Sequence, residues 1–525
     1  MLNKTGGIPM SKRILVMLIA VAMLLCCCVA AQAAGDPTKV VVGVAAEPDA
    51  FFVCHSVNST NMDECPVLHN IYDTLIRRNV DGTYTGLLAT DWSISEDGLT
   101  YTFTIRDGVK FSDGRDMTLE DVVFSFDYTA STKGGKTQLV NYDHAEIVDE
   151  ANRIVAIHLT SAYGGFINAV VNRYGLIYSK SYFEEVGEDG YDAAPITTGP
   201  YKFVEHVSGD HVTVTYNEYY WGEKPAITDI TYKVVKDVNT QMIALEAGEI
   251  DCLLNANISP LLQLAPDSTT KYAIASTAQY TTIGFNCSPS QPTSDINLRK
   301  AICYAIDRDD VNFGAYEDMT TIATHTIPYG FNARPDDEAV DYYTYDPDKA
   351  AEYLAQSNYN GEEVKLITVS GTKDESVCKI VQAQLMDLGI NCTMLATDAG
   401  SYTSMLNDSG DYAICLRSSS SSLMDSDMLI FAFNADVVTT PKYDNGWSEE
   451  FTNKMRDLTW AGRAEGNAEK RKEIYTEAIQ YLYDEAMSCP IVYGLNVVAY
   501  NEKLQGVEPG PLVGIYYIYD WSWAE

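Results

Sequence analysis

The sequence predicts an α/β protein with more than one domain, and three observations lead to this prediction. The chain has 525 residues, which is enough for two or three domains with cores of their own. Its composition is globular, with 46% hydrophobic and 21% charged residues. Its second half alternates strand-like and helix-like segments, which indicates a sheet with right-handed crossovers.

The first predicted elements are short. Residues 39–45 (KVVVGVA) predict a buried strand. Pro66 predicts the start of a helix that has Arg77 and Arg78 in its last turn. The stretch 95–114 predicts a hairpin, because apolar and polar residues alternate through it and Asp-Gly pairs mark its turns.

Clearer signals for helix ends follow. Thr118, with Asp121 three residues later, predicts a capped helix N-terminus. Asp346 followed by Pro347 predicts another, and Gly389 predicts where a later helix ends. The other predicted elements are a hairpin over 201–216, strands over 228–236, 364–370 and 392–396, and helices over 240–247, 298–306 and 377–388.

The N-terminus has the layout of a secretory signal peptide. Lys12 and Arg13 precede the apolar run 14–30, and the small-residue cleavage motif AQA follows it. We expect residues 1–33 to be removed and the protein to be exported, to the periplasm or the cell surface. Two alternatives remain, an uncleaved anchor helix and a lipid anchor on one of the adjacent cysteines 26–28.

The charge of the chain excludes some classes of partner. The formal net charge is −37, so the basic surface that a nucleic-acid-binding protein needs is absent from the composition. The same charge argues against a polybasic membrane-surface role. No second apolar run approaches membrane length, so the rest of the chain is expected to be soluble.

Nine cysteines follow the predicted signal peptide. They are Cys54, Cys65, Cys252, Cys287, Cys303, Cys378, Cys392, Cys415 and Cys489. An exported chain permits disulfides, and two pairings of Cys54 are open, with Cys65 or with Cys252. Cys303 and Cys378 lie in apolar helical patterns and are predicted to be buried thiols.

No catalytic or cofactor-binding motif is found in the sequence. None of the seven histidines lies in an HExxH arrangement, and the Gly-rich phosphate loops and the GxSxG motif are absent. Serines 418–422 could supply a nucleophile, but no base can be assigned to them. We therefore expect a non-enzymatic protein with no cofactor and no metal, and a secreted hydrolase is the less favoured alternative.

Several blocks of the sequence are similar to a known family. Residues 88–126 (LATDWSISEDGLTYTFTIRDGVKFSDGRDMTLEDVVFSF) resemble the signature of the family 5 extracytoplasmic solute-binding proteins, which serve peptide- and nickel-type ABC importers. Further similar blocks follow in the family's order at 195–222, 244–252, 295–308, 345–354 and 489–508. The resemblance extends from residue 38 to about residue 515.

This resemblance implies a two-lobed, periplasmic-binding-protein-like α/β fold (type II, cluster C) with an extra domain beside lobe one. The implied boundaries are 34–78, 195–280 and 488–525 for lobe one, 79–194 for the extra domain and 281–487 for lobe two. Two chain crossings, near 280–286 and 489–494, are expected to act as hinges.

The function implied by the resemblance is that of the solute-binding component of an ABC importer. Such a protein captures a peptide or another small polar solute by lobe closure and delivers it to a membrane permease. We expect a monomer whose partners are its ligand and the transmembrane subunits of the permease. The alternative is a ligand-sensing module of a membrane signalling protein.

The stretch 410–431 departs from the pattern of peptide-binding members. Those members carry a tryptophan and, three residues later, an aspartate that holds the peptide α-ammonium, and Ser419 and Ser422 take these two places here. We predict that Ser419, Ser420 and Ser422 hydrogen-bond the ligand and that Arg417 holds an anionic group. The missing carboxylate predicts weak binding of peptides with a free N-terminal amine. Alternatively, the serines form a solvated loop and Arg417 makes an internal salt bridge.

Three further residues complete the expected ligand-binding site. Glu47 matches a turn that faces the ligand in the family, and Phe51 follows it. Tyr493 lies in the second hinge block, at a position that faces the cleft in relatives. For Phe51 the alternative is packing within the lobe interface.

Overall fold

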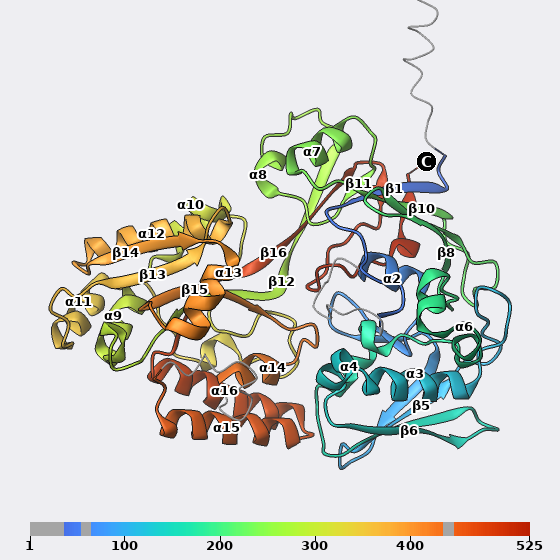
Figure 1. Cartoon of the computed structure of the whole chain (residues 1–525), viewed down its shortest axis with the longest axis horizontal. Helices are drawn as coiled ribbons and strands as arrows, with labels where there is room; N and C mark the ends of the chain where they lie inside the picture. Colours follow the sequence, from blue (N-terminus) through green and yellow to red (C-terminus); the bar gives the residue numbers. More distant parts are fainter. Residues whose placement is uncertain (1–35, 54–64, 434–445, 525) are drawn as a thin grey trace, which may run out of the picture.

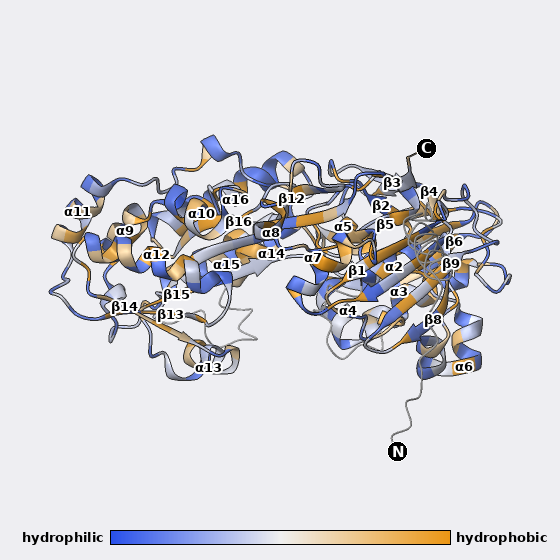
Figure 2. Cartoon of the chain, turned by 90° about the horizontal axis from the view of Figure 1, so that it is seen from above, coloured by the Kyte–Doolittle hydropathy of each residue, from blue (hydrophilic) through white to orange (hydrophobic). Residues whose placement is uncertain are grey.

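The molecule consists of two groups of elements joined by two long strands. The computed structural model describes residues 36–53, 65–433 and 446–524 (Figure 1). Figure 2 shows an elongated molecule in which β12 (Thr270–Phe285) and β16 (Ser488–Asn501) lie between the two groups. This arrangement confirms the predicted two-lobed α/β fold.

Ten strands form one mixed sheet that continues through both lobes. Their order is β14-β13-β15-β12-β16-β11-β1-β10-β9-β8. The bounds not given above are β1 Lys39–Val44, β8 Tyr201–Val207, β9 His211–Tyr216, β10 Asp229–Val234, β11 Cys252–Leu253, β13 Val364–Val369, β14 Cys392–Thr397 and β15 Ile414–Ser420. Pairing is parallel between β1 and its neighbours β10 and β11, and between β13 and its neighbours β14 and β15.

Three smaller sheets accompany the large one. An antiparallel sheet has the order β4-β5-β7-β6, and two-stranded sheets pair β2 with β3 and β17 with β18. The bounds are β2 Ile76–Arg78, β3 Tyr84–Gly86, β4 Ala89–Ile94, β5 Thr100–Ile105, β6 Tyr142–Asp149, β7 Ile154–Leu159, β17 Leu504–Gln505 and β18 Ser522–Trp523.

Helices flank these sheets (Figure 1). Their bounds are α2 Cys65–Ile71, α3 Leu119–Ser131, α4 Lys133–Gln138, α5 Phe166–Val170, α6 Lys180–Ala193, α7 Val238–Glu246, α8 Ile258–Leu261, α9 Ile296–Ala305, α10 Arg308–Tyr316, α11 Pro347–Gln356, α12 Lys373–Asp387, α13 Ala399–Ser404, α14 Ser426–Ile430, α15 Glu449–Ala464 and α16 Ala468–Asp484. At the start of α3, the side chains of Thr118 and Asp121 each accept a hydrogen bond from the other residue's backbone N–H, as predicted.

The two groups of elements have separate hydrophobic cores. One large cluster contains buried residues between 40 and 254, together with Leu423 and residues between 498 and 521. The other contains buried residues between 278 and 493. A smaller cluster under α7 and α8 packs against β16 near Val497. Because the sheet is shared but the cores are not, the strands between the cores connect the two halves.

Two local predictions are wrong. The helix α2 ends at Ile71, and Arg77 and Arg78 lie in β2 rather than in a last helical turn. The strand β2 pairs with β3 across a turn in which Gly82 has φ 87°, a conformation that glycine adopts without strain. The Asp-Gly pair that favours this turn therefore places the two arginines in a hairpin.

The second correction concerns the stretch 95–114. The strand β5 within it pairs with β4 before it and with β7 after it. After Gly108 the chain makes only an isolated bridge between Lys110 and Asp116. Alternation along β5 identified the strand, but its partners come from outside the stretch.

Candidate ligand-binding site between the lobes

The strands β12 and β16 cross between the lobes as one antiparallel pair. Their register runs from Thr270 opposite Asn501 to Gly284 opposite Ser488. It shifts between Ser276 and Tyr280 and again between Thr281 and Thr282. Extra residues in one strand bend a sheet locally, so these shifts mark where the connection bends. On β12 they begin before the predicted hinge 280–286 and overlap only its first residues. On β16 they lie between Pro490 and Leu495, which overlaps most of the predicted hinge 489–494.

The lobes touch beside this crossing through polar side chains. The hydroxyl of Tyr163 donates to Oδ1 of Asp427 over 3.0 Å, and both side chains are fully buried. Arg78 donates to the carbonyl of Gly330, and its Nη1 lies 3.2 Å from Sδ of Met424. These contacts join Arg78 and Tyr163 to α14, to the loop before it and to Gly330.

Two buried ion pairs lie next to this contact. Arg471 binds Asp425 through two hydrogen bonds of 2.7 and 3.1 Å, and Arg463 donates to Asp427. Burial, followed by the charge of Asp425, raises the pKa of Asp427, while Arg463 opposes this shift. Gly165 lies so close that an added Cβ would be 2.9 Å from the Asp425 carboxyl carbon. The lobes therefore meet over a charged and tightly packed surface.

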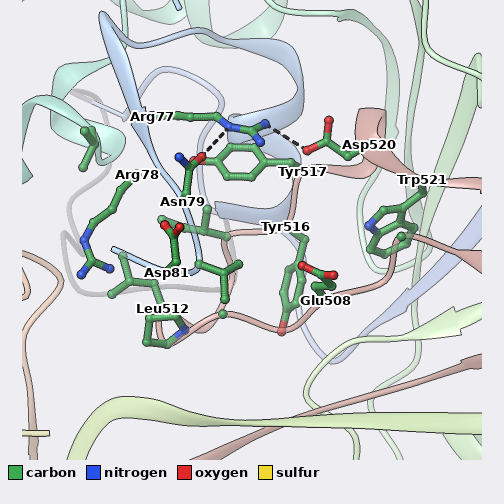
Figure 3. Close-up of a pocket in the computed structure, with 16 residues that line it drawn as sticks. Arg77, Arg78, Asn79, Asp81, Glu508, Leu512, Tyr516, Tyr517, Asp520 and Trp521 are labelled. Carbon is green, nitrogen blue, oxygen red and sulfur yellow. Dashed lines mark hydrogen bonds and ion pairs between the residues drawn. The ribbon is translucent and has the colours of Figure 1, made fainter. Parts of the chain in front are cut away.

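A pocket of about 650 Å³ opens next to this contact (Figure 3). Its lining comes from the β2–β3 hairpin, from the segment that follows β16 and from Val171. The lining residues are Arg77, Arg78, Asn79, Val80, Asp81, Val171, Gly506, Glu508, Gly510, Pro511, Leu512, Ile515, Tyr516, Tyr517, Asp520 and Trp521. Arg78 reaches lobe two, and Leu512 packs against the lobe-two core, so the pocket lies beside the space between the lobes.

One side of the pocket is a fixed arrangement of charge and aromatic rings. The guanidinium of Arg77 lies 4.7 Å from the ring centroid of Tyr517 and 3.0 Å from a carboxylate oxygen of Asp520 (Figure 3). Burial raises the pKa of Tyr517 to about 12, so its hydroxyl is neutral at physiological pH. A volume of this size with apolar walls and a few polar groups is typical of a small-molecule site.

The predicted residues of the serine run lie on and after β15. Successive side chains of a strand point to opposite faces, so Arg417 and Ser419 share one face and Ser420 lies on the other. Arg417 also lines a smaller pocket with Trp447 and Gly284. Ser419 is half-buried, and Ser420 is exposed. The structure therefore brings Arg417 and Ser419 together and separates Ser420 from them.

Ser422 lies where lobe two meets the extra domain. Its hydroxyl donates to Oε1 of Gln138, at the end of α4, over 3.3 Å. The residue is half-buried. Ser422, which the sequence predicts to take the place of an aspartate, thus faces the other half of the molecule.

Glu47 and Phe51 are held inside lobe one. Glu47 accepts hydrogen bonds from Gly209 and Ser208, and its Oε2 lies 2.8 Å from Nε2 of His206. The backbone hydrogen bond from Gly209, followed by the contact with His206, lowers the pKa of Glu47. Phe51 is buried with its ring centroid 4.7 Å from that of Phe203. Both residues thus contact the β8–β9 hairpin.

Tyr493 is fully buried and belongs to the core cluster between 278 and 493. Its hydroxyl donates to the carbonyl of His325 over 3.0 Å, and its ring meets Tyr329 edge to face. Nη2 of Arg334 lies 3.4 Å from the same hydroxyl. The structure therefore places Tyr493 in a packed polar network at the base of β16, and a role in ligand binding stays a prediction.

The pocket residues were missed in the sequence. Arg77 and Arg78 were assigned to a helix end, and the aromatic run 516–521 (YYIYDW) was not singled out. The available signal was the pair of adjacent arginines in a chain of net charge −37. It could not be used alone, because the partner segment follows more than 400 residues later in the sequence.

The cysteine predictions are confirmed in part. Cys303 and Cys378 are buried free thiols, as predicted. Cys252 is also a buried free thiol, which contradicts its pairing with Cys54. Cys54 and the side chain of Cys65 lie outside the described residues, as does the predicted signal peptide 1–33. Within the described ranges, no helix combines the length and apolar character that crossing a membrane requires.

Comparison with known proteins shows what the chain resembles. It is 27% identical over 456 residues to the glutathione-binding protein GsiB of Salmonella typhi, covering 84% of this chain and 86% of that protein. It is 24% identical over 479 residues to the nickel-binding periplasmic protein of Escherichia coli, covering 84% and 87%. The structure of the ABC transporter substrate-binding protein CtaP from Listeria monocytogenes superposes with a TM-score of 0.82 at 23% identity, covering 93% and 100%.

The family itself follows from a match over most of the chain. Residues 83–439 fit the model of the bacterial extracellular solute-binding proteins, family 5. The two lobes, the shared sheet and the sequence blocks agree with this match. The chain belongs to family 5 of the bacterial extracellular solute-binding proteins.

Proposed function

We propose that this protein is the solute-binding component of an ABC importer and that it acts outside the cytoplasmic membrane. The observation that carries the proposal is the pair of strands β12 and β16, which joins two lobes with separate cores and is irregular between them. Such a connection permits hinge closure around a solute. Relatives named for binding glutathione and nickel support the class of function.

The lobe boundaries proposed from the sequence are kept for this function. Lobe one comprises 34–78, 195–280 and 488–525, the extra domain 79–194, and lobe two 281–487. The separate sheet β4-β5-β7-β6 supports the extra domain as a unit. The core cluster between 278 and 493 supports lobe two as a unit, and it extends a few residues beyond the proposed limits at both ends.

We infer that the solute lies between the pocket of Figure 3 and the part of lobe two where Arg417 and Ser419 share one face of β15 and Ser422 follows that strand. The pocket supplies aromatic walls and volume, and Ser422 already meets Gln138 of the extra domain. The solute class is a peptide or another small polar molecule. Because Ser422 replaces a carboxylate, we expect N-blocked peptides, or solutes with an anionic group for Arg417, to bind better than free-amine peptides.

The first experiment tests capture by closure. The mature protein is screened by thermal shift against peptides, amino-acid derivatives, sugars and metal chelates, and a hit is verified by calorimetry. A ligand at one hundred times its Kd stabilises the protein by about 2.7 kcal/mol. Small-angle scattering with the verified ligand should give a smaller radius of gyration. An unchanged radius at saturation contradicts closure, and turnover of any hit contradicts a binding protein.

The second experiment tests the site and its charge. Arg417→Ala should weaken the verified ligand, and Ser422→Asp should strengthen free-amine di- to pentapeptides by roughly ten- to a hundredfold, because it restores an ammonium partner. Ser420→Asp is the control, since it adds the same charge at an exposed position on the face of β15 opposite to Arg417 and Ser419. Tight binding of unblocked peptides to the wild type, with no response to either substitution, would show that another group is the anchor.

The proposal also covers the oligomeric state of the protein and its location after export. We propose a monomer that delivers its solute to the transmembrane subunits of a permease. Light scattering after size exclusion tests the monomer, with a dimer mass as the contradicting result. Intact mass of the exported protein distinguishes cleavage after residue 33 from a lipid-modified cysteine.

A further inference from the structure

Two histidines and a glutamate meet on the outer sheet of the extra domain. His144 of β6 lies directly opposite His158 of β7 in the antiparallel register. Glu146 follows two residues later on β6, so its side chain lies on the same face. One ligand atom from each residue lies within 4.8 Å of the others. In the described ranges this is the one group of three such side chains that could hold a metal ion.

The arrangement around the three side chains orients them toward one another. The rings of His144 and His158 are nearly parallel, with centroids 4.7 Å apart. Nε2 of His158 lies 3.1 Å from Oε1 of Glu146, and its Nδ1 lies 3.3 Å from the hydroxyl of Thr100 on β5. Nδ1 of His144 lies 3.0 Å from the carboxylate of Asp143. Each imidazole therefore has an outer partner of the kind that fixes metal-binding histidines.

The surroundings of His158 leave one of its ring nitrogens for a cation. A threonine hydroxyl can donate or accept a hydrogen bond, so Thr100 can serve as the partner of Nδ1, while Nε2 faces the Glu146 carboxylate.

We propose that His144, His158 and Glu146 form a surface site for a divalent transition metal, Zn²⁺ or Ni²⁺. Two imidazole nitrogens and one carboxylate oxygen are the ligand types that these ions accept, with water completing the coordination. Tetrahedral bonds of about 2.0–2.1 Å place ligand atoms about 3.3 Å apart. His144 and Glu146 are exposed and can rotate by the small amount that is needed.

The site is independent of solute capture. None of its three residues lines the pocket of Figure 3. A metal ion there would link two neighbouring strands of the extra domain and bind the folded chain in preference to the unfolded one, so it should raise the melting temperature. The sequence contains no linear signal for it, because the two histidines are paired across strands rather than spaced along a motif.

The test uses the mature full chain after treatment with EDTA and removal of the chelator. Titration with ZnCl2 and with NiCl2 in a calorimeter should show one saturable site, and ZnCl2 should raise the melting temperature. His144→Ala and His158→Gln should each weaken that site by at least about tenfold, and Glu146→Gln should weaken it less. His211→Ala is the matched control, since His211 also lies between two carboxylates but has no second imidazole in its cluster.

The double variant H144A/H158Q separates the possible results. If metal binds in the solute cleft, that binding persists in the double variant, and only the surface site is lost. Equal stoichiometry and affinity in the wild type and the double variant overturn the proposal, as does the absence of saturable binding in the wild type. Circular dichroism without metal confirms that each variant is folded.

Discussion

Four buried arginines of lobe two form two groups that are held in different ways. Arg463 and Arg471, next to the contact between the lobes, each bind an aspartate side chain. Arg299 and Arg308, next to the start of β16, are held mainly by backbone carbonyl groups. All four side chains are almost fully buried, so each is held in a place where an unpaired charge is costly.

The carbonyl-held group fixes helices to the base of a connecting strand. The carbonyls that Arg299 binds are those of Thr293, Ser294, Glu485 and Ala486. Arg308 donates to the carbonyls of Pro490 and Tyr343, and its Nη2 lies 3.8 Å from Sγ of Cys489. The hydrogen bond from Cys303, with Arg308 as a smaller cause, lowers the pKa of the Cys489 thiol.

The arginines in ion pairs lie at a contact that can rearrange, whereas the arginines bound to carbonyl groups lie in a part of lobe two that is fixed. An arginine and an aspartate can move together on their side chains, so the ion pairs near Tyr163 tolerate changes in lobe contact. Backbone carbonyls move only with the chain that carries them, so Arg299 and Arg308 hold α9 and α10 to the base of β16. Substitutions in the two groups of arginines should therefore destabilise the protein for different reasons.

Breaking an ion pair should have the largest effect. Arg471→Met leaves Asp425 buried without its bidentate partner, and we expect a loss of about 3–5 kcal/mol in the free energy of unfolding, measured by urea denaturation. The double variant D425N/R471M removes both charges and should recover most of this loss. A double variant as unstable as Arg471→Met alone would show that packing, not charge, is the cause.

Removing a carbonyl-held arginine should cost less. Arg308→Met leaves carbonyl groups without a donor but no opposite charge unpaired, so we expect a loss of about 1.5–3 kcal/mol by the same measurement. A loss equal to that of Arg471→Met would remove the distinction between the two groups.

The free energy of unfolding should also depend on pH, because His325 is buried in its neutral form. Nε2 of His325 donates to the carbonyl of Pro335 and Nδ1 accepts from the N–H of Ile327, so both nitrogens are used in the neutral ring. Burial, followed by the charge of Arg334, lowers the pKa of His325 to about 3. The folded state then binds fewer protons than the unfolded state, so stability falls as pH drops below about 6.5.

The measurement compares unfolding of the wild type and His325→Gln at pH 7 and pH 5. The wild type should lose about 2 kcal/mol more between these two values than the variant. Burial also lowers the pKa of His69, to about 4, but that residue is present in both proteins and cancels in the difference. An equal pH dependence of the two proteins would contradict a neutral His325.

The smallest effect is expected at the contact between the lobes. Tyr163→Phe removes the hydrogen bond to Asp427, worth about 1 kcal/mol, and should favour a more open ligand-free state. Small-angle scattering should show a larger radius of gyration. Tyr101→Phe is the matched control, because it removes a buried hydrogen bond to the Tyr163 carbonyl within the extra domain. The same radius in both variants would contradict a role for Tyr163 in lobe contact.

Much of the fold could be predicted from the sequence. The blocks at 88–126 and 195–222 identified the family, and local signals such as Thr118 and Gly389 marked helix ends that the structure contains. These features depend on residues close together in the chain. Arg77 and Arg78 were misplaced because a turn further along, at Gly82, decides their conformation.

The site could be predicted less well. Glu47 contacts the β8–β9 hairpin, and Tyr493 is buried by its network with His325, which no linear pattern indicated. The pocket of Figure 3 joins the segments 77–81 and 506–521, so its existence depends on how distant parts of the chain meet. The face shared by Arg417 and Ser419 could have been predicted from the sequence, because it follows from strand periodicity alone.

The path of the chain through the shared sheet has a consequence for how the protein folds. Residues 281–487 are continuous, so the core between 278 and 493 needs little from elsewhere. Lobe one needs β16 beside β11, and the indole of Trp523 donates to the carbonyl of Lys39 over 2.8 Å. Refolding should therefore pass through an intermediate in which lobe two is folded and lobe one is not. In that intermediate the edge of β11 is unpaired and can aggregate until β16 pairs with it.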